Sequence, residues 1–277
     1  MPPWRRFLRN RPALAGVVAV GLYVALAAAA PLLAPYDPSQ NELALRLHPP
    51  SAQHWLGNDE LGRDILSRLL WGARISLTIS AGAVAFAAAV GIPLGLAAGY
   101  YGGRADSLIS GAVEVLMAFP GILLALAVVA IFGFGIAKLT LAIGINSVPT
   151  MAWLARGSAR GVRSLDYIEA TRAMGQRNVT IMFRHILPNI MSPIIVQATL
   201  RLATAVLTAS TLSFLGLGVQ PPSPEWGGMI ASSVAYLRVA AHATLIPGLA
   251  LMLVVLGFNL AGDGLRDAWD PALKGID

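Results

Sequence analysis

The chain has 277 residues, of which 56% are hydrophobic and only 12% are charged, and its formal net charge is +6. An ordinary soluble domain carries roughly twice that charged fraction, so the composition excludes this class and favours a membrane protein. The absence of cysteine excludes disulfide bonds and thiolate metal sites.

Charge-free stretches recur along the chain, and most are long enough to cross a bilayer, for which a helix needs roughly 20 apolar residues. They predict an all-α membrane protein with six transmembrane helices. The expected spans are 12–34, 74–100, 107–132, 135–156, 188–215 and 243–262. The first span continues too far to be a cleaved signal peptide.

The distribution of arginine and lysine predicts the orientation of these spans. Basic residues gather near both termini and in the connection at 157–187, and such residues mark the cytoplasmic side. Because this bias accounts for the net charge, we expect no nucleic-acid partner. The predicted segments are a cytoplasmic N-terminus at 1–11, an extracytoplasmic segment at 35–73, a five-helix core at 74–262 that includes the cytoplasmic loop 157–187, and a cytoplasmic C-terminus at 263–277.

Two charge pairs with a spacing of four residues stand in the extracytoplasmic segment. They are Asp59 with Arg63 and Asp64 with Arg68. Pairs at this spacing stabilise helices, and apolar residues line another side of the same stretch. We therefore predict an amphipathic helix that lies at the membrane interface within 35–73.

The second span carries Gly91, Gly95 and Gly99 at every fourth position. Small residues at this spacing let two membrane helices approach closely, either within the chain or against a partner chain. Pro93 in this span and Pro120 in the third span predict kinks.

A polar, basic segment at 166–189 separates the fourth and fifth spans. Asp166 is expected to cap a short helix, with Glu169 completing an approximate capping box. Gly175 is expected to end this helix with a left-handed residue, and Pro188 begins the fifth span.

The short helix has one apolar side, formed by Tyr167, Ala170 and Met174. A helix of barely three turns is marginal in water, so neighbouring membrane helices, a partner or both must hold it. Two interpretations stay open: a solvated loop, or a helix that docks into a groove on a soluble partner.

Two charged residues, Glu114 and Arg201, fall well inside predicted spans rather than near their ends. Arg201 lies 13 residues beyond Pro188, which at about 1.5 Å per residue places it near the bilayer centre. Charges at this depth face a cavity or a partner, so we expect Arg201 to face a pore or to pair with an acid, of which Glu114 is a candidate. The alternative is a longer loop that leaves Arg201 near an interface.

The sequence contains no motif of a catalytic site. It has no G-x-x-x-x-G-K-[ST], H-E-x-x-H or G-x-S-x-G, and its four histidines are scattered. We expect no catalytic residue, no metal site and no bound ATP in this chain.

The polar segment also carries a spaced motif. Its residues are Glu169, Ala170 and Thr171, then Gly175 after three residues, then His185, Ile186, Leu187 and Pro188 after nine more. This pattern resembles the EAA loop of ABC importer permeases, with Thr171 in place of an alanine and His185 in place of an isoleucine. The His-Ile-Leu-Pro form is similar to the dipeptide/oligopeptide branch. Stretches similar to the C-type permease of that branch occur at 54–77, 119–133, 212–230 and 258–271.

The resemblance implies a type I ABC importer permease (MetI-like) core with an extra N-terminal helix, in a bacterial inner membrane. It implies a second homologous permease as a heterodimer partner, two cytoplasmic ATPases that hold ATP and Mg, and an extracytoplasmic binding protein. The residues that it implies for coupling to the ATPases are Asp166, Tyr167, Glu169, Ala170, Thr171, Met174, Gly175 and Pro188.

The implied substrates are dipeptides and oligopeptides, with glutathione or nickel complexes as alternatives within the same family. A secondary transporter or channel would need intramembrane ion sites, for which Glu114 and Arg201 are the only candidates. An intramembrane enzyme is disfavoured because paired catalytic residues are absent.

Overall fold

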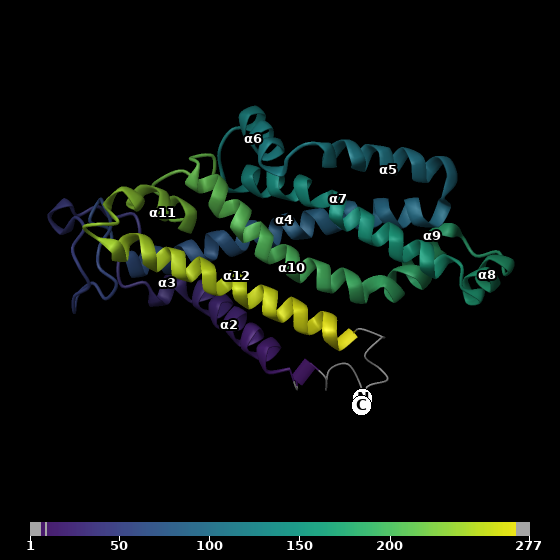
Figure 1. The fold of residues 1–277 in the computed structure, drawn as a ribbon, viewed down its shortest axis with the longest axis horizontal. Coiled ribbons are helices and arrows are strands. Elements are labelled where there is room, and N and C mark those ends of the chain that lie inside the picture. The colour runs from purple at the N-terminus through teal and green to yellow at the C-terminus, as the bar shows by residue number, and fades with distance from the viewer. Residues whose placement is uncertain (1–6, 9, 270–277) are drawn as a thin grey trace.

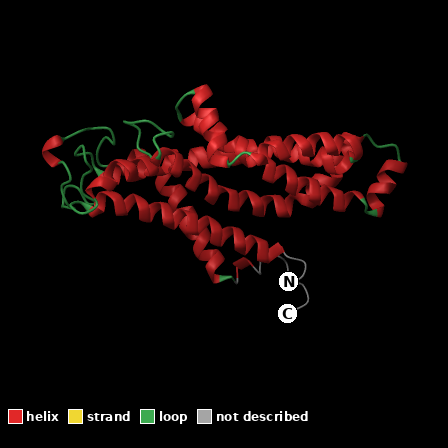
Figure 2. Ribbon diagram, turned by 45° about the horizontal axis from the view of Figure 1, so that its top comes forward, coloured by secondary structure: helices red, strands yellow, loops and turns green. Residues whose placement is uncertain are grey.

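The computed structural model describes residues 7–8 and 10–269, which form an elongated helical bundle (Figures 1 and 2). The prediction of an all-α protein is confirmed, since this part of the chain contains no strand beyond one isolated bridge. The elements are α2 (Arg11–Ala28), α3 (Ala30–Leu33), η1 (Leu43–Leu45), α4 (Ile65–Tyr101), α5 (Gly103–Ala118), α6 (Gly121–Phe132), α7 (Ile136–Arg163), α8 (Asp166–Ala173), α9 (Asn178–Thr180), η2 (Ile181–Ile186), α10 (Leu187–Phe214), α11 (Trp226–Ser233), η3 (Val234–Tyr236) and α12 (Ala241–Trp269).

The two ends of the bundle differ in what they carry. Figure 1 shows α8 and α9 at one end of the long axis, and α3, α11 and their loops toward the other. The backbone of Gly16 on α2 touches α12 near Gly257 and Ala261, while Gly264 faces Ala13. Hence α2 and α12 run antiparallel, and α2 begins where α12 ends. Most of the predicted N-terminal segment 1–11, and residues 270–277 of the C-terminal one, lie outside the described residues.

Fewer helices than the predicted six are apolar enough to span a membrane by length and composition. Within the described ranges four qualify: α2, α4, the continuous helix Asn178–Phe214, and α12. The pair α5 and α6 counts as a fifth if it forms one span. The helix α7, expected as a span at 135–156, does not qualify. It runs beside α4, and protein covers much of its surface, so it needs less apolar surface than a lipid-exposed helix.

The predicted third span, 107–132, is not one straight helix. The axes of α5 and α6 differ by 90° across a short break. Pro120 sits at this break as the residue before α6, and Phe119 is extended, as expected for a residue that precedes proline. Figures 1 and 2 show α6 projecting from the bundle. Pro93, in contrast, lies within the uninterrupted helix α4.

The glycines of the second span face α7 of the same chain. A Cβ on Gly91 would meet Val148 and Met151, one on Gly95 would meet Ala152, and one on Gly99 would meet Arg156 and Ala159. The contacted residue numbers rise together along both helices, so α4 and α7 run parallel. The two helices can approach this closely only because these glycines carry no side chain.

The substitution Gly95→Ala is expected to destabilise the protein, because its Cβ would lie only 2.1 Å from the backbone oxygen of Ala152. A backbone atom cannot move aside alone, so α4 and α7 must separate, at a cost of about 1–3 kcal/mol. Thermal unfolding in detergent measures the effect. The control is Gly157→Ala on α7, where a Cβ would meet nothing within 4 Å. Equal melting temperatures for the two variants would contradict the close α4–α7 contact.

The amphipathic helix predicted within 35–73 does not form as expected. Residues 59–64 form a turn, because Asp59 accepts backbone hydrogen bonds from Leu61 and Arg63 at 2.9 Å, and Gly62 has a positive φ of 76°. Asp64 then caps α4 by accepting from the backbone N–H of Ser67. The helical part that follows is simply the first turns of α4.

The charges of this turn pair differently from the predicted pattern. Arg63 does bind Asp59, at 2.7 Å, but Arg68 binds Asp59 at 3.2 Å rather than Asp64. Arg68 also donates to the carbonyl of Pro38, at 2.8 Å. These contacts fasten the extended segment before α4 onto the end of the bundle.

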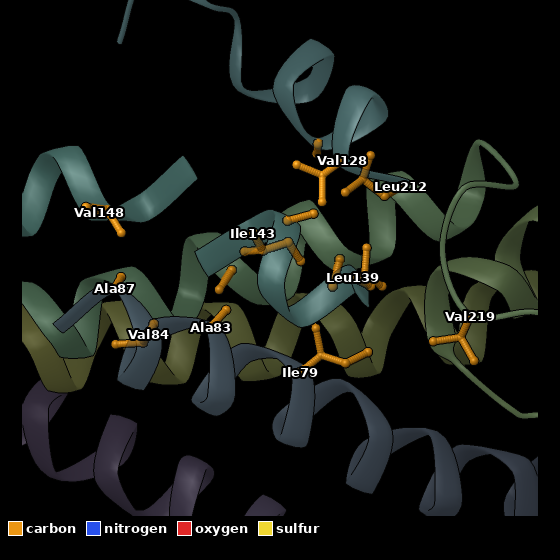
Figure 3. Close-up of a cluster of buried hydrophobic side chains, with 14 of the residues drawn as sticks. Ile79, Ala83, Val84, Ala87, Val128, Leu139, Ile143, Val148, Leu212 and Val219 are labelled. Atoms are coloured by element: carbon orange, nitrogen blue, oxygen red, sulfur yellow. The ribbon is translucent and has the colours of Figure 1, made fainter. Parts of the chain in front are cut away.

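A central apolar cluster joins α4, α6, α7 and α10 (Figure 3). Its members include Ile79 and Ala83 from α4, Val128 from α6, Ile143 from α7 and Leu212 from α10. Since these helices are far apart in sequence, the cluster fixes their arrangement and holds α10 in the middle of the bundle.

Candidate functional site

The helix α8 forms the tip of the bundle, and its start differs from the predicted cap. Leu165 occupies the N-cap position without a side-chain hydrogen bond, so the expected cap at Asp166 is wrong. Asp166 is instead the first helical residue, and Glu169 also lies in the first turn. Both carboxylates stabilise the N-terminal end of the helix by interacting with the helix dipole, rather than by forming a capping box.

The end of α8 matches the prediction for Gly175. This residue has a φ of 73°, in the left-handed region. Its N–H donates to the carbonyl of Arg172 at 2.9 Å, and the N–H of Gln176 donates to that of Thr171 at 3.3 Å. These two bonds form a Schellman motif, which stops the helix and turns the chain back toward the membrane helices.

One side of α8 is held by the bundle. Ile168 is completely buried, and Thr171 is also buried, with its hydroxyl donating to the carbonyl of Ile168 at 2.7 Å. Ile168 belongs to an apolar cluster with residues from four other elements. The remaining buried members are Leu96, Tyr100, Ala155, Ala159, Ile181, Met182, Ile186, Ile190 and Ile194. Thr171 therefore faces this cluster, although the motif grouped it with the residues expected to contact a partner.

The other side of α8 exposes apolar residues. Met174 is 70% exposed and Tyr167 is 41% exposed, and Ala170 between them is exposed as well. We call these three residues the tip face. The neighbouring apolar residues Leu165, Val179 and Phe183 are also exposed. A monomer gains nothing from apolar groups presented together in this way, so the tip face has the character of an interaction surface.

A tyrosine fastens the tip to the end of α4. The hydroxyl of Tyr100 donates to the side chain of Asn178 at 2.8 Å and accepts from Nε of Arg172 at 3.3 Å. The Arg172 guanidinium also lies 4.9 Å from the centre of the Tyr100 ring. Tyr100 was not among the predicted site residues. Its place at the end of an apolar run, two residues before Gly102, is the signal that could have identified it.

The connection from the tip to α10 contains a π-helix, η2. The N–H of Leu187 donates to the carbonyl of Met182, five residues earlier. Pro188 follows as the second residue of α10, and it has no N–H to donate to the preceding turn. The side chain of Asn189 donates to the carbonyl of His185 at 2.7 Å. The wider turn thus accommodates the proline without a break in the helix.

The two charges predicted inside the membrane are not paired with each other. Glu114 is exposed on α5, and no ion pair joins it to Arg201 among the described residues. Arg201 is partly buried near the middle of α10, and its Nη2 donates to the hydroxyl of Thr150 on α7 at 2.6 Å.

An ion-pair cluster that sequence reasoning missed joins α5 to α7. The Asp106 carboxylate binds Arg156 and, at 2.7 Å, Arg160, and it accepts from the hydroxyl of Ser110 at 3.1 Å. The two arginines lie four residues apart on α7, a spacing that could have indicated a common partner. The cluster lies near the tip end of the bundle, where it ties α5 to the last turns of α7.

Comparison with protein families gives two matches. Residues 91–275 match the family described as binding-protein-dependent transport system inner membrane component. Residues 3–50 match the N-terminal transmembrane domain of oligopeptide transport permease C. Together these matches cover most of the chain.

Two curated proteins show close similarity along nearly the whole chain. The glutathione transport system permease protein GsiD of Pectobacterium atrosepticum is 50% identical over 272 residues, which are 98% of this chain and 90% of that protein. The dipeptide transport system permease protein DppC of Alkalihalophilus pseudofirmus is 46% identical over 276 residues, with 98% and 91% coverage.

Solved structures of similar fold come from the MetNI methionine ABC transporter in inward-facing conformations. One chain aligns with a TM-score of 0.59 at 20% identity, over 73% of this chain and 97% of that one. At this identity the likeness concerns the fold alone. The fold is that of a type I importer permease, as the spaced motif led us to expect.

Proposed function

This chain is an ABC importer permease that belongs to the family of binding-protein-dependent transport system inner membrane components, and we propose that it forms half of a translocation pore for dipeptides and oligopeptides. The observation that carries the proposal is the tip face of α8. It combines exposed apolar residues with a helix end that is firmly attached to the bundle.

The tip face is the proposed docking site for a cytoplasmic ATPase. An apolar helix face that enters a groove is a common mode of protein recognition, and Tyr167, Ala170 and Met174 provide such a face. Glu169 and Arg172 lie on exposed polar sides of the same helix and can form the rim of the contact. Asp166, Gly175 and Pro188 act indirectly, through the start, the stop and the exit of the segment.

The energy source is proposed to lie outside this chain. ATP and Mg bind to two ATPase subunits, and this permease carries no catalytic residue. Closure of the ATPases around ATP displaces α8, and the contact between Ile168 and its cluster passes the movement to α4, α7 and α10. The bundle then moves between outward and inward access, as a two-state element biased by a ligand on a partner.

The orientation follows from the position of the tip. If α8 contacts cytoplasmic ATPases, then the start of α2 and the end of α12 also lie on the cytoplasmic side of a bacterial inner membrane. The loops near α3 and α11 then face the extracytoplasmic binding protein. The other half of the pore is proposed to be a second, homologous permease in a heterodimer.

The substrate class rests on the relatives. One is named for dipeptide transport and another for transport of glutathione, which is itself a small peptide with free carboxylates. Dipeptides and oligopeptides are therefore the first proposal, and glutathione is the second. Nickel complexes remain the alternative within the family.

The test uses the complex purified with its own ATPases and binding protein and placed in lipid bilayers. Hydrolysis of ATP is measured with the binding protein empty, loaded with dipeptides or tripeptides, loaded with glutathione, and loaded with nickel chelates. We expect stimulation by the peptides. Stimulation by nickel chelates alone would contradict the proposed substrate. Failure of any ATPase to co-purify would contradict the docking role of α8.

A further inference from the structure

We infer that Arg201 is the centre of a carboxylate-binding site on the translocation path, which receives the terminal carboxylate of a peptide as it crosses the membrane. The inference rests on the proposed function and deepens it, because it names the chemical group that the path recognises. Arg201 is the fifteenth of the 28 residues of α10, so about 20 Å of helix separates it from either end.

Arg201 belongs to a polar stripe along α10. The stripe consists of Gln197, Arg201, Thr204, Thr208 and Thr211, at alternating spacings of four and three residues, which place them on one face of the helix. All five are at least partly exposed in the isolated chain. A stripe with an arginine at this depth is costly in contact with lipid, so it must face another polypeptide or a water-filled path.

The guanidinium has hydrogen-bonding capacity that the described residues leave unused. It has five N–H groups, and only the bond to Thr150 is formed. No carboxylate of the described residues lies within ion-pair distance of it. A planar guanidinium with free donors matches a carboxylate, which it binds through two parallel hydrogen bonds.

The threonines of the stripe supply the complementary chemistry. The hydroxyls of Thr204, Thr208 and Thr211 donate to backbone carbonyls of their own helix, at 3.0, 2.8 and 2.8 Å. Each hydroxyl proton is therefore engaged in this hydrogen bond, while the hydroxyl oxygen can still accept a hydrogen bond from another donor. Such oxygens suit the ammonium and amide N–H groups of a peptide, and Arg201 suits its carboxylate.

A cavity continues this path toward the α8 end. Its volume is about 630 Å³, and its lining includes Gln197 of the stripe together with Asn189, Ser192 and Arg266. Gln197 thus connects the stripe to the cavity, and Arg266 places a second guanidinium beside the exit. An anionic group that leaves Arg201 therefore meets polar side chains and another positive charge.

The experiment measures ATP-dependent uptake into proteoliposomes that contain the complete complex with its binding protein. The probes are the dipeptide Ala-Phe and its C-terminal amide, each at a concentration that saturates the binding protein by calorimetry. For Arg201→Gln we expect uptake of Ala-Phe to fall about tenfold, as for loss of a charge-assisted hydrogen bond, while uptake of the amide changes less than about twofold. Arg201→Lys keeps the charge but cannot form two parallel hydrogen bonds, so its uptake of Ala-Phe is expected to lie between the rates of the wild type and of Arg201→Gln.

The matched controls lie on the same helix. Thr199 makes the same type of hydroxyl bond, to Ile195 at 3.0 Å, but it stands on another face of α10. We expect Thr204→Val to slow uptake and Thr199→Val to leave it unchanged. If Arg201→Gln impairs assembly with the ATPases, Thr150→Val serves instead, because it removes only the hydrogen bond that orients the guanidinium.

The outcomes separate the two proposals. If the wild-type complex takes up neither probe, the proposed function fails, and the inference fails with it. If the wild-type complex imports Ala-Phe and Arg201→Gln does so at the same rate, only the inference is overturned. An equal loss of uptake for Ala-Phe and its amide would assign Arg201 to a contact with the partner permease. If the binding protein does not bind the amide, the test is the uptake of Ala-Phe by the two Arg201 variants. Uptake by Arg201→Lys that is as slow as uptake by Arg201→Gln would overturn the carboxylate site.

Discussion

The substitution Met174→Glu is expected to release the ATPase subunits from the complex and to abolish uptake. Met174 is more exposed than Tyr167, the other large side chain of the tip face, and it stands one residue before the glycine that ends the helix. In a docked complex the new carboxylate would be buried without a partner, at a cost of about 3 kcal/mol, which weakens binding roughly a hundredfold. Co-purification of the ATPases through a tag on the permease measures the loss.

A matched control separates the contact from a general effect of a surface charge. Leu43 is 68% exposed, close to the value for Met174, but it lies in the segment at the opposite end of the bundle. Leu43→Glu is expected to retain the ATPases. If Met174→Glu also retains them in wild-type amount, α8 does not dock through this face.

The substitution Ile168→Ala is expected to uncouple ATP hydrolysis from transport. The side chain is fully buried in the cluster beneath α8, and its truncation costs about 3 kcal/mol. Apart from Thr171, α8 buries no other side chain, so this loss exceeds what the short helix can replace. The ATPases would then move a helix that is only loosely packed against the bundle, so less of its movement would reach the membrane helices. We expect a several-fold lower ratio of peptide imported to ATP hydrolysed.

Two measurements complete this prediction. Hydrogen exchange should accelerate about a hundredfold in residues 165–176, since the local stability falls by that free energy. The control Ile131→Ala removes the same atoms from a side chain that is 76% exposed on α6. An unchanged ratio of peptide imported to ATP hydrolysed in Ile168→Ala, together with normal hydrogen exchange, would show that the contact between Ile168 and its cluster does not transmit movement.

The parts of the fold that were predictable from sequence are those that lipid would surround. The helices α2, α4, α10 and α12 are apolar over most of their surface, so composition alone located them. The helix α7 was also predicted as a span, at 135–156, from its charge-free run, but polar residues such as Asn146 and Thr150 make it less apolar than these four helices. It packs against α4 along its length and is covered by protein there. Tertiary contacts, rather than local composition, decide how apolar such a helix must be.

In the candidate site, too, local features were predictable from sequence and features that depend on tertiary contacts were not. Gly175 was correctly placed because a positive φ requires a specific residue type, and the exposed face followed from helical periodicity. The roles of Tyr100 and Asp106 were not visible, because each depends on residues far along the chain. The burial of Thr171 was not visible either, because it depends on how α8 sits on the bundle. Asp166 was taken for a cap because the sequence pattern does not distinguish the N-cap from the first helical position.

Because η2 continues directly into α10, the helix of the predicted fifth span can act as one rigid lever. Residues Asn178–Phe214 form one uninterrupted rod of 37 residues, about 55 Å long, with one end beside the tip and Arg201 roughly 35 Å along it. A tilt of about 10° about the π turn at Ile181–Ile186, whose centre lies about 26 Å from Arg201, would move the guanidinium sideways by about 5 Å. The π turn at Ile181–Ile186 is the natural fulcrum, since its hydrogen bonds are the least regular of the rod. A small displacement of α8 would thereby become a displacement of the size of an amino acid at Arg201.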